Sequence, residues 1–296
     1  MWLVNATLAL LLIGASACAQ PPGVVTLPQA LRVAVVSLAH PTPLVIRGEV
    51  ILTRDCMRRA GFRYPQGGAQ ESLRGSIFGL AGQLSVRSAR AHGYGAEIQQ
   101  ISGHVSRFDP MTRYLKALTP SRQQRFMSVL QGSPSDYIPV RTWDGRVVDV
   151  ATGGCVALAR DAIYGSPQDF LFVSRFPVYL FRYAQQIEHS PMYHRARSAY
   201  AACMTRAGYD VDGPGAAINL ALKQFGSTDN RMSAIERAMA VADATCQATS
   251  RVFSAWDSVG WALAARWILQ HQAQIVALAR IQQEASIRAR SVVASH

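Results

Sequence analysis

Two carboxylates have the spacing that could support chemistry. Glu236 and Asp243 are seven residues apart in an alanine-rich stretch, so on a helix they share one face. Such a pair could supply the acid and the base of glycan cleavage. An acidic residue in an alanine-rich helix can instead cap a neighbouring chain or pair with an arginine. We favour the structural interpretation and keep wall-directed hydrolysis as a competing hypothesis.

A short phrase occurs twice in the chain, as CMRRAGFR from Cys56 and as CMTRAGYD from Cys203. Each copy is typical of a helix end, because a glycine adopts the left-handed conformation beyond the cap with no Cβ penalty. The aromatic residue after the glycine then folds back onto the methionine five residues earlier. The expected helix-stop residues are Gly61 and Phe62 in the first copy and Gly208 and Tyr209 in the second. This motif predicts architecture, not chemistry.

Four of the five cysteines, Cys56, Cys155, Cys203 and Cys246, are far apart in the sequence. They lack the C-x-x-C spacing of metal knuckles and redox motifs, so we expect two structural disulfides, for which three pairings exist. The repeated phrase suggests pairing within each half, Cys56 with Cys155 and Cys203 with Cys246. The alternative is that the cysteines are reduced and buried.

The N-terminus resembles an export signal. Residues 1–19 carry no charge, are apolar from Trp2 to Ile13, and reach small residues before Cys18. Ala15-Ser16-Ala17-Cys18 is similar to a lipobox with alanine in place of the usual leucine, which would make Cys18 a lipid anchor. Cleavage after Ala19 would instead release a free protein. We therefore expect an exported chain, either a membrane-anchored lipoprotein or a secreted protein; a buried helix and an uncleaved anchor are the alternatives.

Composition indicates a globular, basic protein. The chain is 49% hydrophobic and 16% charged, which is too apolar for disorder, and its formal net charge is +12. Only Lys116 and Lys223 among its 30 basic residues are lysines. The charge favours an anionic surface as partner, but the arginines are scattered and no nucleic-acid-binding signature is present, so sequence-specific nucleic-acid binding is not expected. The arginines could equally cover solvated helix faces.

No cofactor or metal site is expected from the sequence. The seven histidines include no H-E-x-x-H pair, and no Gly-x-Ser-x-Gly elbow occurs. His189 and His194 are five apart around Pro191, a spacing more typical of a surface loop than of a metal site. Trp256 and Trp267 are eleven apart and nearly in line on a helix, which favours core packing over an exposed sugar-binding ladder.

The elements predict a mainly α fold, bundle-like, with two related halves each stapled by a disulfide. Asp144-Gly145 favours a tight turn, so one small β-hairpin is expected near 138–150. Pro177 is expected to kink or interrupt the helical segment that contains it. The predicted division is a signal peptide at 1–19, a proline-rich tether at 20–45, a first helical half with the hairpin at 46–165, a second helical half at 166–255 and a long C-terminal helix at 256–296.

Several of these features together resemble a family of uncharacterised secreted proteins or lipoproteins of actinobacteria. They are the doubled Cys-Met-x-x-x-Gly-aromatic motif, a Gly-Tyr-Gly after a short helix, a Gly-Gly-Cys helix that ends in Tyr-Gly, and Ala-Asp-x-x-Cys. The resemblance spans Glu49 to Cys246. The matching positions are Cys56, Tyr94, Gly95, Cys155, Tyr164, Cys203 and Cys246. It implies an exported, disulfide-bonded fold and no particular activity.

The sequence therefore predicts an exported cell-surface protein that binds or scaffolds without catalysis, with a ligand or protein of the cell envelope as its partner. A wall-directed hydrolase that uses Glu236 and Asp243 and an arginine-driven polyanion binder are the competing hypotheses.

Overall fold

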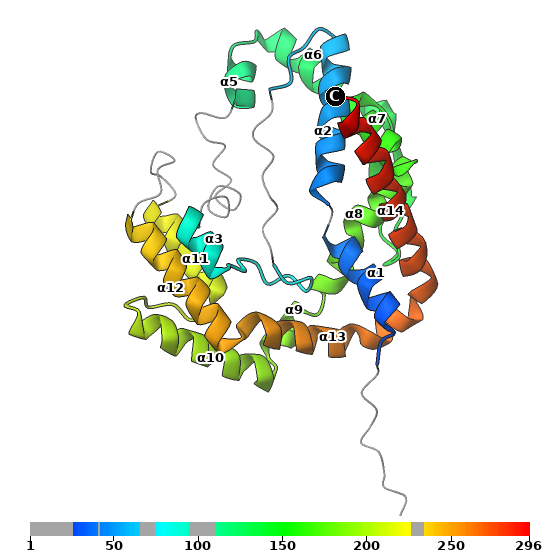
Figure 1. Cartoon of the computed structure of the whole chain (residues 1–296). Coiled ribbons are helices and arrows are strands. Elements are labelled where there is room, and N and C mark those ends of the chain that lie inside the picture. Colours follow the sequence, from blue (N-terminus) through cyan, green and yellow to red (C-terminus); the bar gives the residue numbers. More distant parts are fainter. Residues whose placement is uncertain (1–25, 41, 66–74, 95–109, 226–233) are drawn as a thin grey trace, which may run out of the picture.

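The structure is a computed structural model that describes residues 26–40, 42–65, 75–94, 110–225 and 234–296. It is mainly α-helical, with one two-stranded antiparallel sheet among these residues (Figure 1). The signal peptide at 1–19, the proposed anchor Cys18 and Gly95 lie outside the described ranges. The main helices are α1 (Gln29–Ala39), α2 (Pro43–Arg59), α3 (Val86–His92), α5 (Pro110–Lys116), α6 (Pro120–Gln131), α7 (Gly154–Tyr164), α8 (Pro167–Phe181), α9 (Ala184–Glu188), α10 (Pro191–Arg206), α11 (Pro214–Phe225), α12 (Ala234–Ser250), α13 (Val252–Gln270) and α14 (Gln272–Ala294).

Four of the described α-helices begin at a hydroxyl residue followed by proline, and in three of them the hydroxyl caps the helix. The side chains of Thr119, Ser166 and Ser190 each accept a hydrogen bond from a backbone N–H in the first turn of α6, α8 and α10. The proline that follows suits the first helical position, because its missing N–H has no helical partner there. These Ser/Thr-Pro pairs therefore stabilise the starts of α6, α8 and α10.

The hairpin lies where the sequence predicts it. Strand β1 (Tyr137–Arg141) pairs antiparallel with β2 (Val147–Ala151), and Arg141 lies opposite Val147. Gly145 has a φ of +78°, and its N–H donates to the carbonyl of Thr142 at 2.9 Å. Glycine tolerates this left-handed conformation, so it closes the turn between the strands.

Both copies of the repeated phrase end a helix in the same way. The N–H groups of Phe62 and Tyr209 donate to the carbonyls of Met57 and Met204 at 2.9 Å in each case. The preceding glycines, with φ of +82° at Gly61 and +90° at Gly208, each donate to the carbonyl three residues earlier at 3.0 Å. These two backbone hydrogen bonds together define a Schellman motif.

Each of these helices is joined to another helix by a disulfide. Cys56 of α2 is bonded to Cys155 of α7, with 5.5 Å between the Cα atoms, and Cys203 of α10 is bonded to Cys246 of α12, with 5.6 Å. This is the within-half pairing that the sequence predicts. The surroundings of the two bonds differ, because Met57, Phe62, Phe126 and Cys155 form a small separate core whereas Met204 and Cys246 belong to the main core.

Packing crosses the predicted boundary between the halves. The C-terminal helix α14 lies along α2 and α7, and the short helix α3 packs on α12, on the other side of Figure 1. Helix α13 connects the two regions and packs on α9 and α10. The spatial units are therefore not the segments 46–165 and 166–255, because each disulfide-bonded helix pair buries its remaining apolar face with a helix from the other end of the chain.

Two element boundaries differ from the sequence prediction, and Pro177 does not interrupt its helix. Part of the expected tether at 20–45 is the helix α1, whose Leu31, Val35 and Leu38 are buried. The expected helix at 256–296 is two helices separated at His271. Helix α8 continues through Pro177 without interruption. In α1, burial of an apolar face stabilises the helix despite the prolines in the segment. The composition of the segment alone does not reveal this.

The segment 29–59, with a mean hydropathy of 1.3 over its most apolar window, is long and apolar enough to cross a membrane by length and composition alone. It forms two helices, α1 and α2, and both pack on α14. Val45 and Ile51 of α2 are buried in the protein, although only 29% of the apolar window as a whole is buried.

We expect Gly61→Ala and Gly208→Ala each to lower the free energy of unfolding by about 1 to 2 kcal/mol, because an L-residue is disfavoured in the left-handed region. A Cβ at either position would meet no atom within 4 Å, so the cost comes from the backbone and not from a clash. Denaturant titration measures this cost.

Gly215→Ala is the matched control for these variants. Gly215 lies in α11 with open space around it and has no positive φ, so alanine should be neutral or stabilising there. Equal stability of the Gly61 and Gly208 variants and the wild type would contradict the left-handed helix stops.

Candidate functional site

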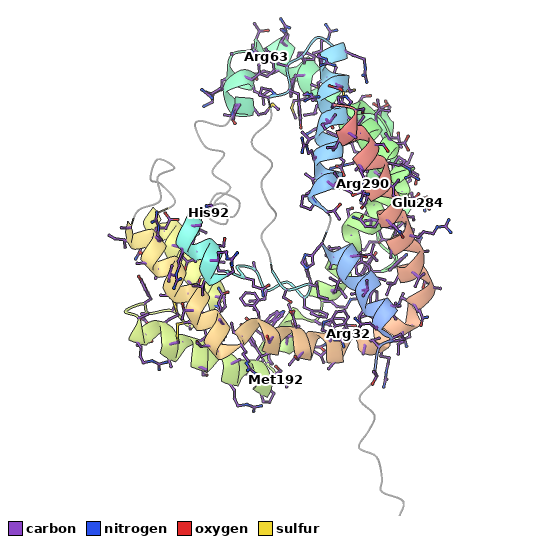
Figure 2. All side chains as sticks on the ribbon, viewed as in Figure 1. Arg32, Arg63, His92, Met192, Glu284 and Arg290 are labelled. Atoms are coloured by element: carbon purple, nitrogen blue, oxygen red, sulfur yellow. A yellow bond between two sulfur atoms is a disulfide. The ribbon has the colours of Figure 1, made fainter. Side chains whose placement is uncertain are left out.

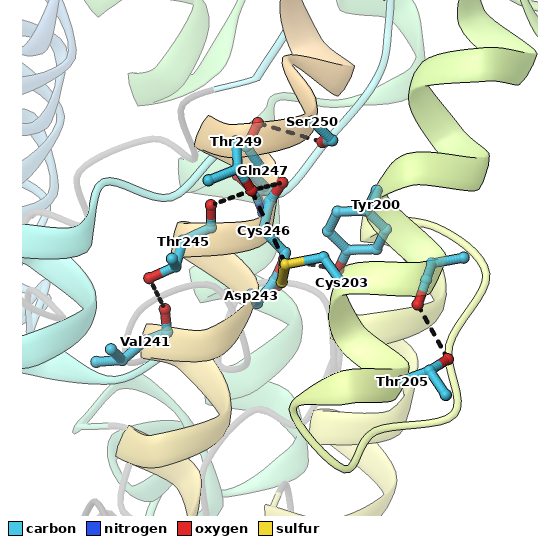
Figure 3. Close-up of a disulfide and its surroundings, with 11 residues drawn as sticks. Tyr200, Cys203, Thr205, Val241, Asp243, Thr245, Cys246, Gln247, Thr249 and Ser250 are labelled. Atoms are coloured by element: carbon cyan, nitrogen blue, oxygen red, sulfur yellow. Dashed lines mark hydrogen bonds between the residues drawn. A yellow bond between two sulfur atoms is a disulfide. The ribbon is translucent and has the colours of Figure 1, made fainter.

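The two candidate carboxylates lie on α12 and are both buried. The relative solvent exposure is 7% for Glu236 and 0% for Asp243. Figure 3 shows Asp243 pointing into the space beside Tyr200 and the Cys203–Cys246 disulfide. The shared face predicted from their spacing is therefore directed at the protein interior.

Three side chains satisfy the carboxylate of Asp243. Oδ1 accepts from the hydroxyl of Tyr200 at 2.7 Å and from Nε2 of Gln247 at 2.9 Å, and Oδ2 accepts from the hydroxyl of Tyr94 at 2.9 Å. Both phenols are fully buried. The sequence predicted an arginine partner or a helix cap for this residue, and the observed partners are instead two tyrosines and a glutamine.

Gln247 extends this network to the loop before α3. Its Nε2 also donates to the carbonyl of Gly82 at 2.9 Å, and its Oε1 accepts from the N–H of Leu84 at 2.9 Å. The side-chain amide of Gln247 thus bonds the backbone as a neighbouring β-strand would. It pairs backbone groups that burial would otherwise leave without a hydrogen-bond partner. A segment 163 residues away in sequence is held against α12 as a result.

Burial dominates the electrostatics of this network. Desolvation raises the pKa of Asp243 to about 6, although the hydrogen bonds from Tyr200, Gln247 and Tyr94 favour the charged form and oppose the rise. Burial, followed by the nearby charge of Asp243, raises the pKa of Tyr94 and Tyr200, so both phenols remain donors. Asp243 has no cationic partner among the described residues, and its buried carboxylate is tolerated because its oxygens are hydrogen-bonded.

Among the described residues, the geometry encloses Asp243 completely and leaves Glu236 almost fully buried. Glycosidic cleavage needs an acid and a base on either side of an accessible bond. Asp243 has no exposed surface and accepts hydrogen bonds on both oxygens. The arrangement positions helices and offers no acid–base pair to solvent.

A second polar cluster ties the first disulfide region to the chain end. Asp55, next to Cys56, accepts from Nε of Arg54 at 3.1 Å and lies 2.7 Å from Nε2 of His296. Nearby, burial raises the pKa of Glu49, while the charge of Arg160, whose Nε is 3.7 Å away, opposes the rise. These contacts join α2 to α7 and α14.

The tryptophans form tertiary contacts and no exposed ladder. Trp256 is buried, with its ring 4.8 Å from that of Tyr193, and Trp267 stacks on His271 at 4.4 Å. Trp143 at the hairpin turn stacks on Tyr179 of α8 at 5.3 Å. The sequence did not reveal this role of Trp143, because a tryptophan in a turn gives no sign of the helices on which it packs.

The arginines are spread over the molecule. Arg32, Arg63 and Arg290 lie on well-separated parts of the structure in Figure 2. Within the described ranges, seven arginines form ion pairs with carboxylates; they are Arg54, Arg58, Arg146, Arg160, Arg197, Arg280 and Arg288. Others on the described helices, such as Arg195, Arg251 and Arg266, have no acidic partner among the described residues, so part of the positive charge is available to a ligand.

The chain matches no family model, no curated protein and no solved structure in comparisons with known proteins. Within the described ranges, no three histidine, cysteine, aspartate or glutamate side chains are grouped to hold a metal ion. The candidate site therefore rests on the chain's own geometry, a buried carboxylate network beside a disulfide.

We expect stability to depend on pH through Asp243. Its folded-state pKa of about 6 exceeds the ordinary value of 3.8, so the folded state binds the proton more tightly than the unfolded state. The free energy of unfolding should therefore fall as the pH rises from about 4 to about 6, by about 2 to 3 kcal/mol from this group. Asp243→Asn should remove that component, which urea titrations across this pH range would measure; an unchanged slope would contradict the assignment.

We expect Tyr94→Phe and Tyr200→Phe each to lower the free energy of unfolding by about 1 to 3 kcal/mol at neutral pH, because each removes a buried donor to a charged acceptor. Tyr183→Phe is the control, since its hydroxyl makes no hydrogen bond with the described residues, and it should change stability by less than about 0.5 kcal/mol. Equal effects of all three substitutions in thermal or chemical unfolding would argue against the network.

Proposed function

We propose that this chain is an exported protein of the cell envelope that binds or scaffolds another envelope component and performs no catalysis. The observation that carries the proposal is the pair of disulfides, Cys56–Cys155 and Cys203–Cys246, each joining two helices. Disulfides of this kind persist in oxidising compartments and are rare in the cytosol. The signal-like residues 1–19 support the same location.

The absence of accessible chemistry in the candidate pair supports a binding role over hydrolysis. The side chain of Asp243 is used to hold α3, α10 and α12 together. A framework fixed by two covalent bonds and a buried polar network presents surfaces of constant shape, which reduces the conformational cost of binding. Cys18 would decide between a lipid-anchored and a free form, and both fit this role.

An anionic ligand is the second candidate that a specific observation favours. The formal net charge is +12, and several exposed arginines have no acidic partner in the described part of the chain. Positive charge of this size attracts anionic surfaces over a distance set by the salt concentration.

We expect the mature protein from its native host to lack the signal segment and to gain the mass of four hydrogen atoms on reduction, as two disulfides require. Intact-mass spectrometry before and after reduction would measure this, and an acyl modification at Cys18 would appear in the same spectrum. Four free thiols, or an uncleaved chain, would contradict export.

The binding role is tested separately. The purified oxidised protein should sediment with washed envelope fragments, and Asp243→Asn should sediment equally well, because Asp243 contacts no ligand. Protein that remains in the supernatant at physiological salt would contradict the proposal.

A further inference from the structure

A shallow hollow lies between α10 and the start of α13, on a surface the candidate carboxylates do not share. It encloses about 410 Å³ and is open to solvent. Arg195 lines it from α10, and Arg251 lines it from the junction between α12 and α13. Met192, labelled in Figure 2 near the beginning of α10, lies at its edge.

The hollow is positively charged and rich in hydroxyl donors. Ser254 and Ser258 line the α13 side, and no acidic residue lines any part of it. Neither arginine forms an ion pair, and neither of these serines forms a side-chain hydrogen bond, with the residues the structure describes. The polar groups of the hollow are thus available to a ligand that accepts hydrogen bonds and carries negative charge.

Small apolar side chains also line the hollow. Ala196 and Ala199 come from α10 and Ala255 comes from α13, two helices that pack on each other. On α13, Ser254 and Ser258 are one turn apart, about 6 Å along the helix axis. A wide, open hollow lined by basic, hydroxyl and methyl groups suits an extended chain more than a compact ion.

The backbone at Arg251 is unusual. It has a φ of +55° and a ψ of +32°, and it is the one non-glycine residue with positive φ among the described residues. This left-handed conformation turns the chain from α12 into α13, and glycine would adopt it with less strain. The arginine at this corner therefore carries a conformational cost, and it is one of the residues that line the hollow.

We propose that the hollow between α10 and α13 binds the phosphate groups of an anionic phosphodiester chain, with Arg195 and Arg251 as its principal contacts. A guanidinium donates two parallel hydrogen bonds to phosphate, and a tetrahedral phosphate offers further acceptors to the serines that line the hollow. A planar carboxylate has fewer acceptors to share between two walls. This inference rests on the proposed binding function and names its ligand class.

The test uses the full oxidised chain and a soluble poly(glycerol phosphate) oligomer as the probe, with affinity measured by calorimetry at ~50 and ~200 mM salt. Arg195→Gln combined with Arg251→Gln should weaken binding by about ten-fold or more, since each removes a charge-assisted contact. The slope of log affinity against log salt concentration should also become shallower by about one for each arginine removed.

The matched control is Arg266→Gln combined with Arg290→Gln. Both arginines are exposed on α13 and α14, away from the hollow, and the net charge changes equally. This pair should weaken binding by less than about three-fold, as long-range electrostatics alone would. Equal losses for the two double variants would overturn the site, because total charge and not the hollow would then determine binding.

Arg251→Gly separates binding from folding. Glycine accepts the left-handed conformation, so the thermal midpoint should be unchanged or higher while affinity for the oligomer falls. A variant that retains full affinity would overturn the role of Arg251.

Two further experiments identify the source of the phosphate and distinguish failure of this site from failure of the proposed binding function. Vesicles that contain ~30% phosphatidylglycerol should bind wild type and the Arg195/Arg251 double variant equally; arginine-dependent vesicle binding without oligomer binding would overturn the assignment to a polymer. Sedimentation of both proteins with envelope fragments would leave the binding function standing and overturn the site, whereas failure of the wild type to sediment would overturn the binding function itself.

Discussion

The buried carboxylate of Asp243 is the constraint on which the second disulfide region depends. Its oxygens hold Tyr94 from the segment after α3 and Tyr200 from α10, while Gln247, one turn further along α12, binds the backbone before α3. Removing a charge from water is costly unless each lone pair finds a donor, so the three elements have little freedom to move apart. The Cys203–Cys246 disulfide, beside this network, then joins α10 and α12 covalently.

The first disulfide region uses a different balance of forces. Around Cys56 and Cys155 the core is small and aromatic, with the rings of Phe62 and Phe126 meeting edge to face at 5.4 Å. Its polar contacts are ion pairs at its margin, such as Asp55 with Arg54, in place of a fully buried network. Two copies of one helix-stop motif therefore serve in unlike surroundings, since the motif specifies how a helix ends and not what covers it.

The described titratable groups and the described surface groups differ in their surroundings. The groups with the most strongly perturbed pKa values are enclosed, and the polar groups that remain available are arginines and serines on the outside. Perturbed titratable groups often mark active sites, but structural networks perturb the pKa in the same way. Here the full enclosure of Asp243 supports the structural explanation.

Local patterns in the sequence determined the helix starts at Ser166 and Ser190, the glycine-ended helices at Gly61 and Gly208, the hairpin around Gly145 and the pairing of the cysteines. Each of these depends on bonds between residues close in sequence or on a visible repeat. The tertiary structure alone decided that Tyr94 and Tyr200 would meet Asp243, that Trp143 would stack on Tyr179, and that α14 would return to α2. Such contacts join residues far apart in sequence, and hydrophobic burial, which selects them, is non-directional, so no local pattern encodes the partner.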